Sequence, residues 1–202
     1  MTLTQIRALV LLLVYFVVRF VFSEQLDSLG MWSSYYFEAV YVGLVAWLYW
    51  SRLSFRVPFS FRLATQFVFS VMAGLVIYKL AAPLGLIVPF DMRSTETLIL
   101  LLLVGPILEE MIFRMAMWEL LSEFLKEKGQ LILATSVIFA FAHFFAWWFV
   151  PNELRSYVLY QAIYAFFLGS YLAFFKSREK SVGVPIVLHF FFNLGYFIGF
   201  AI

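Results

Sequence analysis

The sequence predicts an all-α integral membrane protein of about seven transmembrane helices, with a long or kinked fourth helix. Of its 202 residues, 64% are hydrophobic and only 13% are charged, whereas soluble domains are about half apolar and about a quarter charged. Several windows approach the roughly 20 apolar residues that a membrane-spanning helix needs. Backbone groups in lipid must be hydrogen-bonded within the spanning structure, which makes helices the natural form of these windows.

Seven hydrophobic segments follow one another, and together they predict a single polytopic membrane domain over residues 1–202. The first segment lacks a small-residue cleavage site, so we interpret it as a retained span and not as a signal peptide. The approximate bounds of the segments are residues 3–22, 35–50, 63–82, 95–124, 131–150, 157–175 and 182–202.

The fourth segment is longer than one span requires. Thirty residues of helix extend about 45 Å, against about 30 Å for the hydrocarbon core of a membrane. Pro106 lies inside this segment and should kink the helix or start a new one. Its later part carries several charged residues, which predict an amphipathic end that emerges into the cytoplasm.

The connections between segments differ in basic charge, and this difference predicts the orientation. The odd-numbered connections carry only Arg93 and Arg155, and the first of them has no basic residue. We therefore expect a cytoplasmic N-terminus and an external C-terminus. The basic residues of the even-numbered connections are Arg52, Arg56, Arg62, Lys126, Lys128, Lys176, Arg178 and Lys180.

Two adjacent carboxylates, Glu109 and Glu110, lie directly after an apolar run. Ionisable groups inside a membrane are costly and are functional candidates by default. Glu110 and Arg114 are four residues apart and can pair on one helix face, as a purely structural ion pair would. Glu109 lies about 100° around the helix from Glu110, so it can face a cavity and act as a general base.

The chain contains two histidines, each in another apolar segment. His189 shares a helix face with Asn193, and the two can donate hydrogen bonds to an oxyanion. His143 can hold a water beside Glu109. A structural interpretation stays open for each residue: a histidine hydrogen-bonded in the core, or an asparagine that joins helices.

Thiol chemistry is excluded because the chain has no cysteine. The remaining side chains can supply an activated water and oxyanion donors without any cofactor. Zinc is the alternative: the two histidines and Glu109 could ligate Zn²⁺ and leave an open position for water. Against zinc, the ligands would come from three separate helices.

Three motifs occur in order: Glu109-Glu110-x-x-x-Arg114, Phe139-x-x-x-His143 and His189-x-x-x-Asn193. They resemble the signature of the CAAX protease and bacteriocin-processing (CPBP, or Abi) family, which includes type II CAAX prenyl proteases. The resemblance covers about residues 108–195 and implies a family-like catalytic core at about 95–202. It implies an all-helical intramembrane endopeptidase of the glutamic type, with a site that opens toward the cytoplasm.

The resemblance also implies a role for each motif residue. Glu109 corresponds to the general base, and His143 to its partner in activating water. His189 and Asn193 take the oxyanion role. The supporting residues are Glu110, Arg114 and Phe139.

We expect a peptide or protein substrate, with a prenylated C-terminus as one option, and membrane lipid as partners. The net charge of +2 is too small to suggest nucleic acid. The main alternative function is a non-catalytic membrane binding, immunity or scaffold protein that uses the same polar cavity. A zinc-dependent intramembrane metalloprotease is a second alternative.

The depths of the candidate residues conflict in this scheme. Measured from the cytoplasmic ends of their helices, Glu109 lies about 25 Å deep, His143 about 20 Å and His189 about 10 Å. The three can meet only if the fourth helix projects well into the cytoplasm or the last span starts deep.

Overall fold

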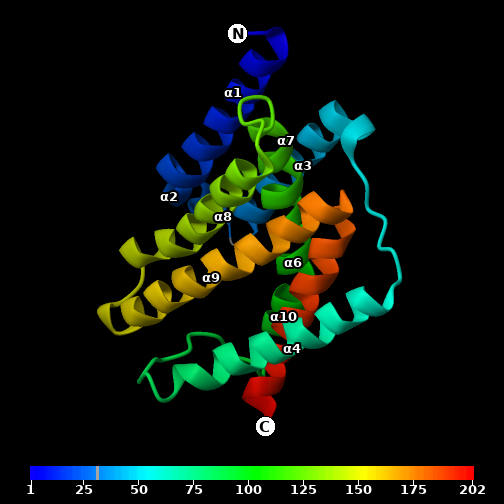
Figure 1. The fold of residues 1–202 in the computed structure, drawn as a ribbon. Coiled ribbons are helices and arrows are strands. Elements are labelled where there is room, and N and C mark those ends of the chain that lie inside the picture. Colours follow the sequence, from blue (N-terminus) through cyan, green and yellow to red (C-terminus); the bar gives the residue numbers. More distant parts are fainter. Residues whose placement is uncertain (31) are drawn as a thin grey trace.

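The computed structural model describes residues 1–30 and 32–202, and the regular elements in that part of the chain are all helical. The first and last residues lie at opposite ends of the molecule (Figure 1). The α-helices are α1 (Leu3–Phe16), α2 (Ser23–Ser28), α3 (Ser33–Tyr49), α4 (Phe61–Ala81), α5 (Thr95–Ile99), α6 (Gly105–Glu110), α7 (Trp118–Leu121), α8 (Lys128–Phe144), α9 (Asn152–Glu179) and α10 (Gly183–Ala201).

The all-helical prediction is confirmed, and each of the seven hydrophobic segments lies largely within helix. Within the described residues, five helices are long and apolar enough to cross a membrane: Leu3–Val21, Phe61–Ala81, Lys128–Trp148, Asn152–Glu179 and Gly183–Ala201. The second and fourth segments, which correspond to α3 and to α5–α7, are not among these five. The chain is therefore an integral membrane protein by composition and fold, and the count of seven spans stays a prediction.

The fourth segment forms one long helix with two wide turns. Two π-helical stretches, Leu100–Val104 and Met111–Met117, join α5 to α6 and α6 to α7. The N–H of Gly105 donates to the carbonyl of Leu100, five residues back, and Pro106 has no N–H to donate. The two carboxylates of α6 thus lie between π-helical stretches, which are frequent at functional sites. The predicted bend at Pro106 stays a prediction.

Helices α4 and α10 are in backbone contact. A Cβ at Gly195 would collide with the carbonyl oxygen of Val71 on α4, and one at Gly74 with the carbonyl oxygen of Phe192 on α10. Small residues allow such close approach between membrane helices. The contact fixes α10, which carries His189 and Asn193.

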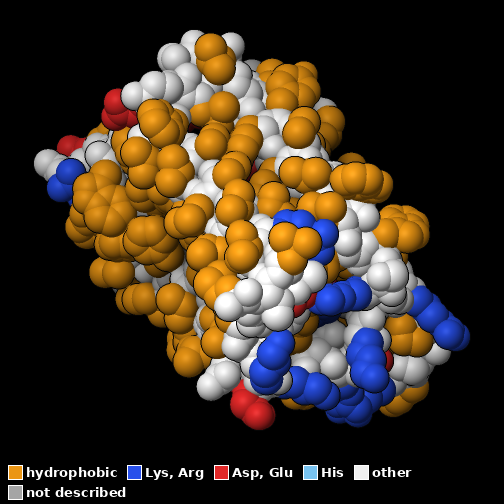
Figure 2. All heavy atoms as spheres, turned by 90° about the horizontal axis from the view of Figure 1, so that it is seen from above, with side chains coloured by type: hydrophobic (Ala, Val, Ile, Leu, Met, Phe, Trp, Pro, Cys, Tyr) orange, Lys and Arg blue, Asp and Glu red, His pale blue; other side chains and the backbone are white. Residues whose placement is uncertain are grey.

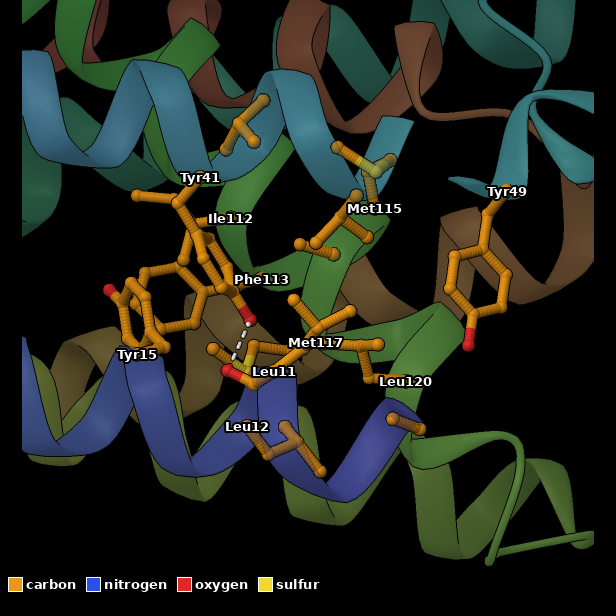
Figure 3. Close-up of a cluster of buried hydrophobic side chains, with 14 of the residues drawn as sticks. Leu11, Leu12, Tyr15, Tyr41, Tyr49, Ile112, Phe113, Met115, Met117 and Leu120 are labelled. Carbon is orange, nitrogen blue, oxygen red and sulfur yellow. Dashed lines mark hydrogen bonds between the residues drawn. The ribbon is translucent and has the colours of Figure 1, made fainter. Parts of the chain in front are cut away.

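A cluster of buried hydrophobic side chains holds the fourth helix against α1 and α3 (Figure 3). Met115, Met117 and Leu120 are fully buried there. The hydroxyl of Tyr41 on α3 donates to the carbonyl of Leu11 on α1 at 3.3 Å. This apolar packing anchors the part of the chain that follows Glu109 and Glu110.

The even-numbered connections meet at one end of the molecule. Arg52 of the second connection pairs with Glu123 of the fourth at 2.7 Å. Ser181, at the end of the sixth, donates through its hydroxyl to the carbonyl of Arg56 at 2.6 Å. Figure 2 shows Lys and Arg side chains gathered on one part of the surface beside a broad hydrophobic area. These contacts bring the second, fourth and sixth connections together at one end of the molecule, which we call the basic end.

Candidate active site

One cavity of about 600 Å³ brings three helices of the sequence motifs together. Glu109 from α6, His143 from α8, and His189 and Asn193 from α10 all line it. Figure 1 shows that α8 and α9 run side by side while α6 and α10 are inclined to them. Oε2 of Glu109 on α6 and Nε2 of His189 on α10 lie 3.8 Å apart although the two residues lie at unequal distances from the ends of their helices, so the ends of these two helices are not level.

Glu110 is the centre of a buried polar network. Arg114 donates from Nη1 to Oε1 of Glu110 at 3.1 Å, and Nδ1 of His189 lies 2.8 Å from the same oxygen. Glu110 and Arg114 are completely buried. Since a carboxylate only accepts, the proton lies on Nδ1 of His189. The network therefore fixes the orientation of the His189 ring.

Arg114 also ties this network to α9 and to Phe139. Its Nη2 donates to the carbonyl of Gly169 at 3.1 Å, and a Cβ at Gly169 would lie 3.3 Å from that nitrogen. The guanidinium lies 4.4 Å from the centre of the Phe139 ring. That ring in turn meets the His143 ring edge to face, with centres 4.6 Å apart. Phe139 thus connects the buried cation to a cavity-lining histidine.

Glu109 faces the cavity with a free oxygen. Its Oε2 is buried but has no hydrogen-bond partner in the described structure. This oxygen lies 4.0 Å from Nε2 of His143 and 3.8 Å from Nε2 of His189. Nδ1 of His143 lies 2.9 Å from the carbonyl of Phe139, which only accepts. A neutral His143 ring therefore turns the lone pair of Nε2 toward Glu109.

Asn193 is held by the fourth helix. Its Nδ2 donates to the carbonyl of Leu101 at 2.7 Å. Leu101 lacks the usual helical donors, because Gly105 donates to Leu100 and Pro106 has no N–H. A side-chain amide has two N–H groups, so one remains for another acceptor. Pro106 and Asn193 thus form a single local arrangement at the cavity wall.

The cavity also contains residues that the sequence analysis did not single out. Arg19 and Glu38 line it as an ion pair at 3.0 Å. Gln161 and Tyr164 line it from α9. With Tyr157 they recur at the i, i+4, i+7 spacing of one helix face. This stripe of polar side chains in an apolar segment is the sequence pattern that could have indicated a cavity-facing side of α9.

Across residues 1–30 and 32–202, no group of three or more His, Cys, Asp or Glu side chains is spaced to hold a metal ion. Glu109 and the two histidines lie near one another, with Oε2 of Glu109 4.0 Å and 3.8 Å from their Nε2 atoms, but do not form such a group. Zinc therefore stays an alternative that needs a direct test.

Comparison with known families identifies a match over half of the chain. Residues 93–195 match the family model described as type II CAAX prenyl endopeptidase Rce1-like. The matched stretch contains all seven residues of the three motifs. No curated protein and no solved structure matched the chain.

Proposed function

The chain belongs to the type II CAAX prenyl endopeptidase Rce1-like family, as its motifs predicted, and on that premise we propose that it is a glutamic-type intramembrane endopeptidase. Membership supports a membrane protease that acts on a peptide or protein. The catalytic class, the residue roles and a prenylated substrate are the parts that we propose here.

One observation carries the mechanism: the unpartnered Oε2 of Glu109 lies 4.0 Å from Nε2 of His143. A single water can bridge this separation with two hydrogen bonds of about 2.8 Å. The water would donate one proton to each acceptor, which leaves an oxygen lone pair for the carbonyl carbon of the peptide. Glu109 is then the general base.

The following steps use the other residues of the cavity. As the water oxygen bonds to the carbonyl carbon, Glu109 takes a proton and the carbonyl oxygen becomes negative. The free N–H of Asn193 and Nε2 of His189 can donate to that oxygen. His189 donates in this way only as a doubly protonated ring, because Nδ1 already donates to Glu110. The C–N bond then breaks, and Glu109 returns its proton to the leaving amine.

Glu110, Arg114 and Phe139 have supporting roles in this scheme. The carboxylate of Glu110 stabilises a charged His189 ring, and Arg114 balances the second negative charge of the site. Seven spans with a cytoplasmic N-terminus complete the proposal. The gathering of the even-numbered connections at one end supports that orientation.

The test is cleavage by the purified protein of three substrates: prenylated CAAX peptides, the same peptides without prenyl groups, and an unrelated membrane peptide. Glu109→Gln should lower kcat by about 10²- to 10⁴-fold. It should leave the fold intact, because Oε2 of Glu109 has no protein partner to lose. Glu24→Gln, at an exposed position outside the cavity, is the matched control and should cleave like the wild type.

The other possible results of this cleavage test would each favour a different mechanism or function. Full activity of Glu109→Gln would contradict the mechanism. Loss of wild-type activity with a chelator, restored by zinc, would favour a metalloprotease. No cleavage of any peptide by the folded wild type would favour the non-catalytic binding, immunity or scaffold function.

A further inference from the structure

A second groove lies at the basic end, between α8 and α9. It has a volume of about 540 Å³ and shares no lining residue with the candidate active site. The first turns of α8 and the last turns of α9 form its walls, so it belongs to the fourth and sixth connections. Its lining residues are Lys128, Ile132, Phe174, Ser177, Arg178 and Lys180.

The groove carries an excess of positive charge. Three of its six lining residues are cations and none is acidic. Lys128 and Lys180 make no ion pair or side-chain hydrogen bond within the described part of the chain, unlike the buried Lys176. Arg178 pairs through Nε with Glu179 at 3.3 Å, which leaves its two terminal nitrogens for another acceptor. Such a surface favours an anionic ligand.

Lys128 occupies a position that its helix disfavours. It begins α8, and the N-terminus of a helix carries partial positive charge, so a cation is unfavourable there. The first turn has no acidic residue, and the side chain of Glu127 makes no capping hydrogen bond. The N–H groups of this turn and the ammonium group of Lys128 therefore both favour an anion beside them.

Lys180 also occupies an unfavourable position. It caps the C-terminus of α9 with a φ of 52°, in the left-handed region, where glycine is the usual residue at the end of a helix. Among the described residues it is the only one other than glycine with a positive φ. Two lysines that break local rules and line the same groove indicate a role for their charges.

An apolar surface continues from the groove along α9. Phe174 lines the groove and is 47% exposed. Phe167 and Ile163 precede it on the same helix face and are exposed too. Since α9 is long and apolar enough to cross a membrane, this stripe is suited to contact with lipid acyl chains. Cations at the end of an exposed apolar stripe match the phosphate and the chains of a phospholipid.

We propose that this groove binds the headgroup of an anionic phospholipid, with the phosphate against the three cations and an acyl chain along Phe174. Ser177 can donate its hydroxyl to the same phosphate. Basic pockets between membrane helices bind such headgroups. With the orientation proposed above, the lipid belongs to the cytoplasmic leaflet. The binding itself depends neither on that orientation nor on the endopeptidase function.

The test measures affinities by native mass spectrometry of the full chain in detergent. The ligands are phosphatidylglycerol, phosphatidylcholine with the same acyl chains, and water-soluble glycerol 3-phosphate. Lys128→Gln/Lys180→Gln removes the two lysines of the groove. Arg56→Gln/Arg62→Gln is the matched control, because it removes two exposed charges of the second connection, outside the groove. Size exclusion checks the folding of every variant.

We expect the wild type to bind phosphatidylglycerol more tightly than phosphatidylcholine. The lysine variant should bind phosphatidylglycerol about 10- to 30-fold more weakly, and the control should bind it like the wild type. Equal affinity of the wild type for the two lipids, or of the lysine variant and the wild type for phosphatidylglycerol, would overturn the proposal. Binding of glycerol 3-phosphate as tight as that of the lipid would overturn it in favour of a free phosphate. An equal loss in the control would overturn it in favour of general surface charge.

Lys180→Gly separates the charge from the fold. Glycine adopts a positive φ without steric cost, so this variant should raise Tm in lipid-free detergent while it weakens the binding of phosphatidylglycerol. If Lys180 only ended the helix, its replacement by glycine would leave the lipid affinity unchanged, and that result would contradict the proposed contact.

Discussion

At the scale of single residues, Glu109 and Glu110 show how adjacent carboxylates receive different environments. Glu110 is completely buried and bonded to Arg114 and His189, whereas the side chain of Glu109 is 33% exposed and lines the cavity. The rotation of about 100° between successive helical residues separates them. One carboxylate is positioned to organise the site and the other to accept a proton.

Removal of Arg114 should destabilise the protein strongly. Arg114→Ala leaves the Glu110 carboxylate buried without its cation, which costs about 3–5 kcal/mol for a buried pair. Thermal unfolding in detergent should show a clear fall in Tm. Arg178→Ala, at the pair with Glu179 in which both side chains are about a third exposed, is the control and should cost at most about 1 kcal/mol. Equal Tm values for the two variants would contradict this account of the network.

The sequence could indicate which residues have chemistry, but not all of their partners. The four-residue spacing of Glu110 and Arg114 predicted their pairing, because a helix fixes that distance. The bond of Asn193 to Leu101 could not be predicted, since it depends on which carbonyl the π-helical turn leaves free. The contact of Arg114 with Gly169 depends equally on tertiary packing.

At the scale of elements, the fourth helix positions site residues next to its π-helical stretches. The length of its hydrophobic run predicted this helix. The distances of Glu109, His143 and His189 from the cytoplasmic ends of their helices predicted unequal depths for the three residues. In the structure Glu109 and His189 meet at 3.8 Å, so the ends of the fourth helix and of α10 are not level. Hydropathy fixes where a helix runs in the sequence but not its tilt, which packing against neighbours decides.

Pro106→Ala should separate the shape of this helix from its stability. Alanine supplies the N–H that proline lacks, so residues 101–106 can adopt regular helical bonding and compete with Asn193 for its acceptor. A displacement of about 1 Å at Glu109 or Asn193 would cost about 10²-fold in activity, whereas Tm should not fall. Pro83→Ala, at an exposed position outside the helices, should keep full activity. A fully active Pro106→Ala would show that the wide turn is not needed.

At the scale of the whole molecule, the two segments that are not among the candidate spans both carry charged groups at or beside the cavity. Glu109, Glu110 and Arg114 lie on the fourth helix, and Glu38 lies on α3, which has 17 residues. Polar residues in a membrane helix reduce its hydropathy but commonly face a cavity or a partner. Charged groups in these two segments are therefore compatible with seven spans.

Tags on the two ends of the chain test this count together with the orientation. An odd number of spans with a cytoplasmic N-terminus places the tag on Met1 inside and the tag on Ile202 outside. An external protease added to intact cells should remove the C-terminal tag and leave the N-terminal tag, with an intact cytoplasmic protein as control for leakage. The same fate for both tags would indicate an even number of spans. Loss of the N-terminal tag alone would reverse the orientation.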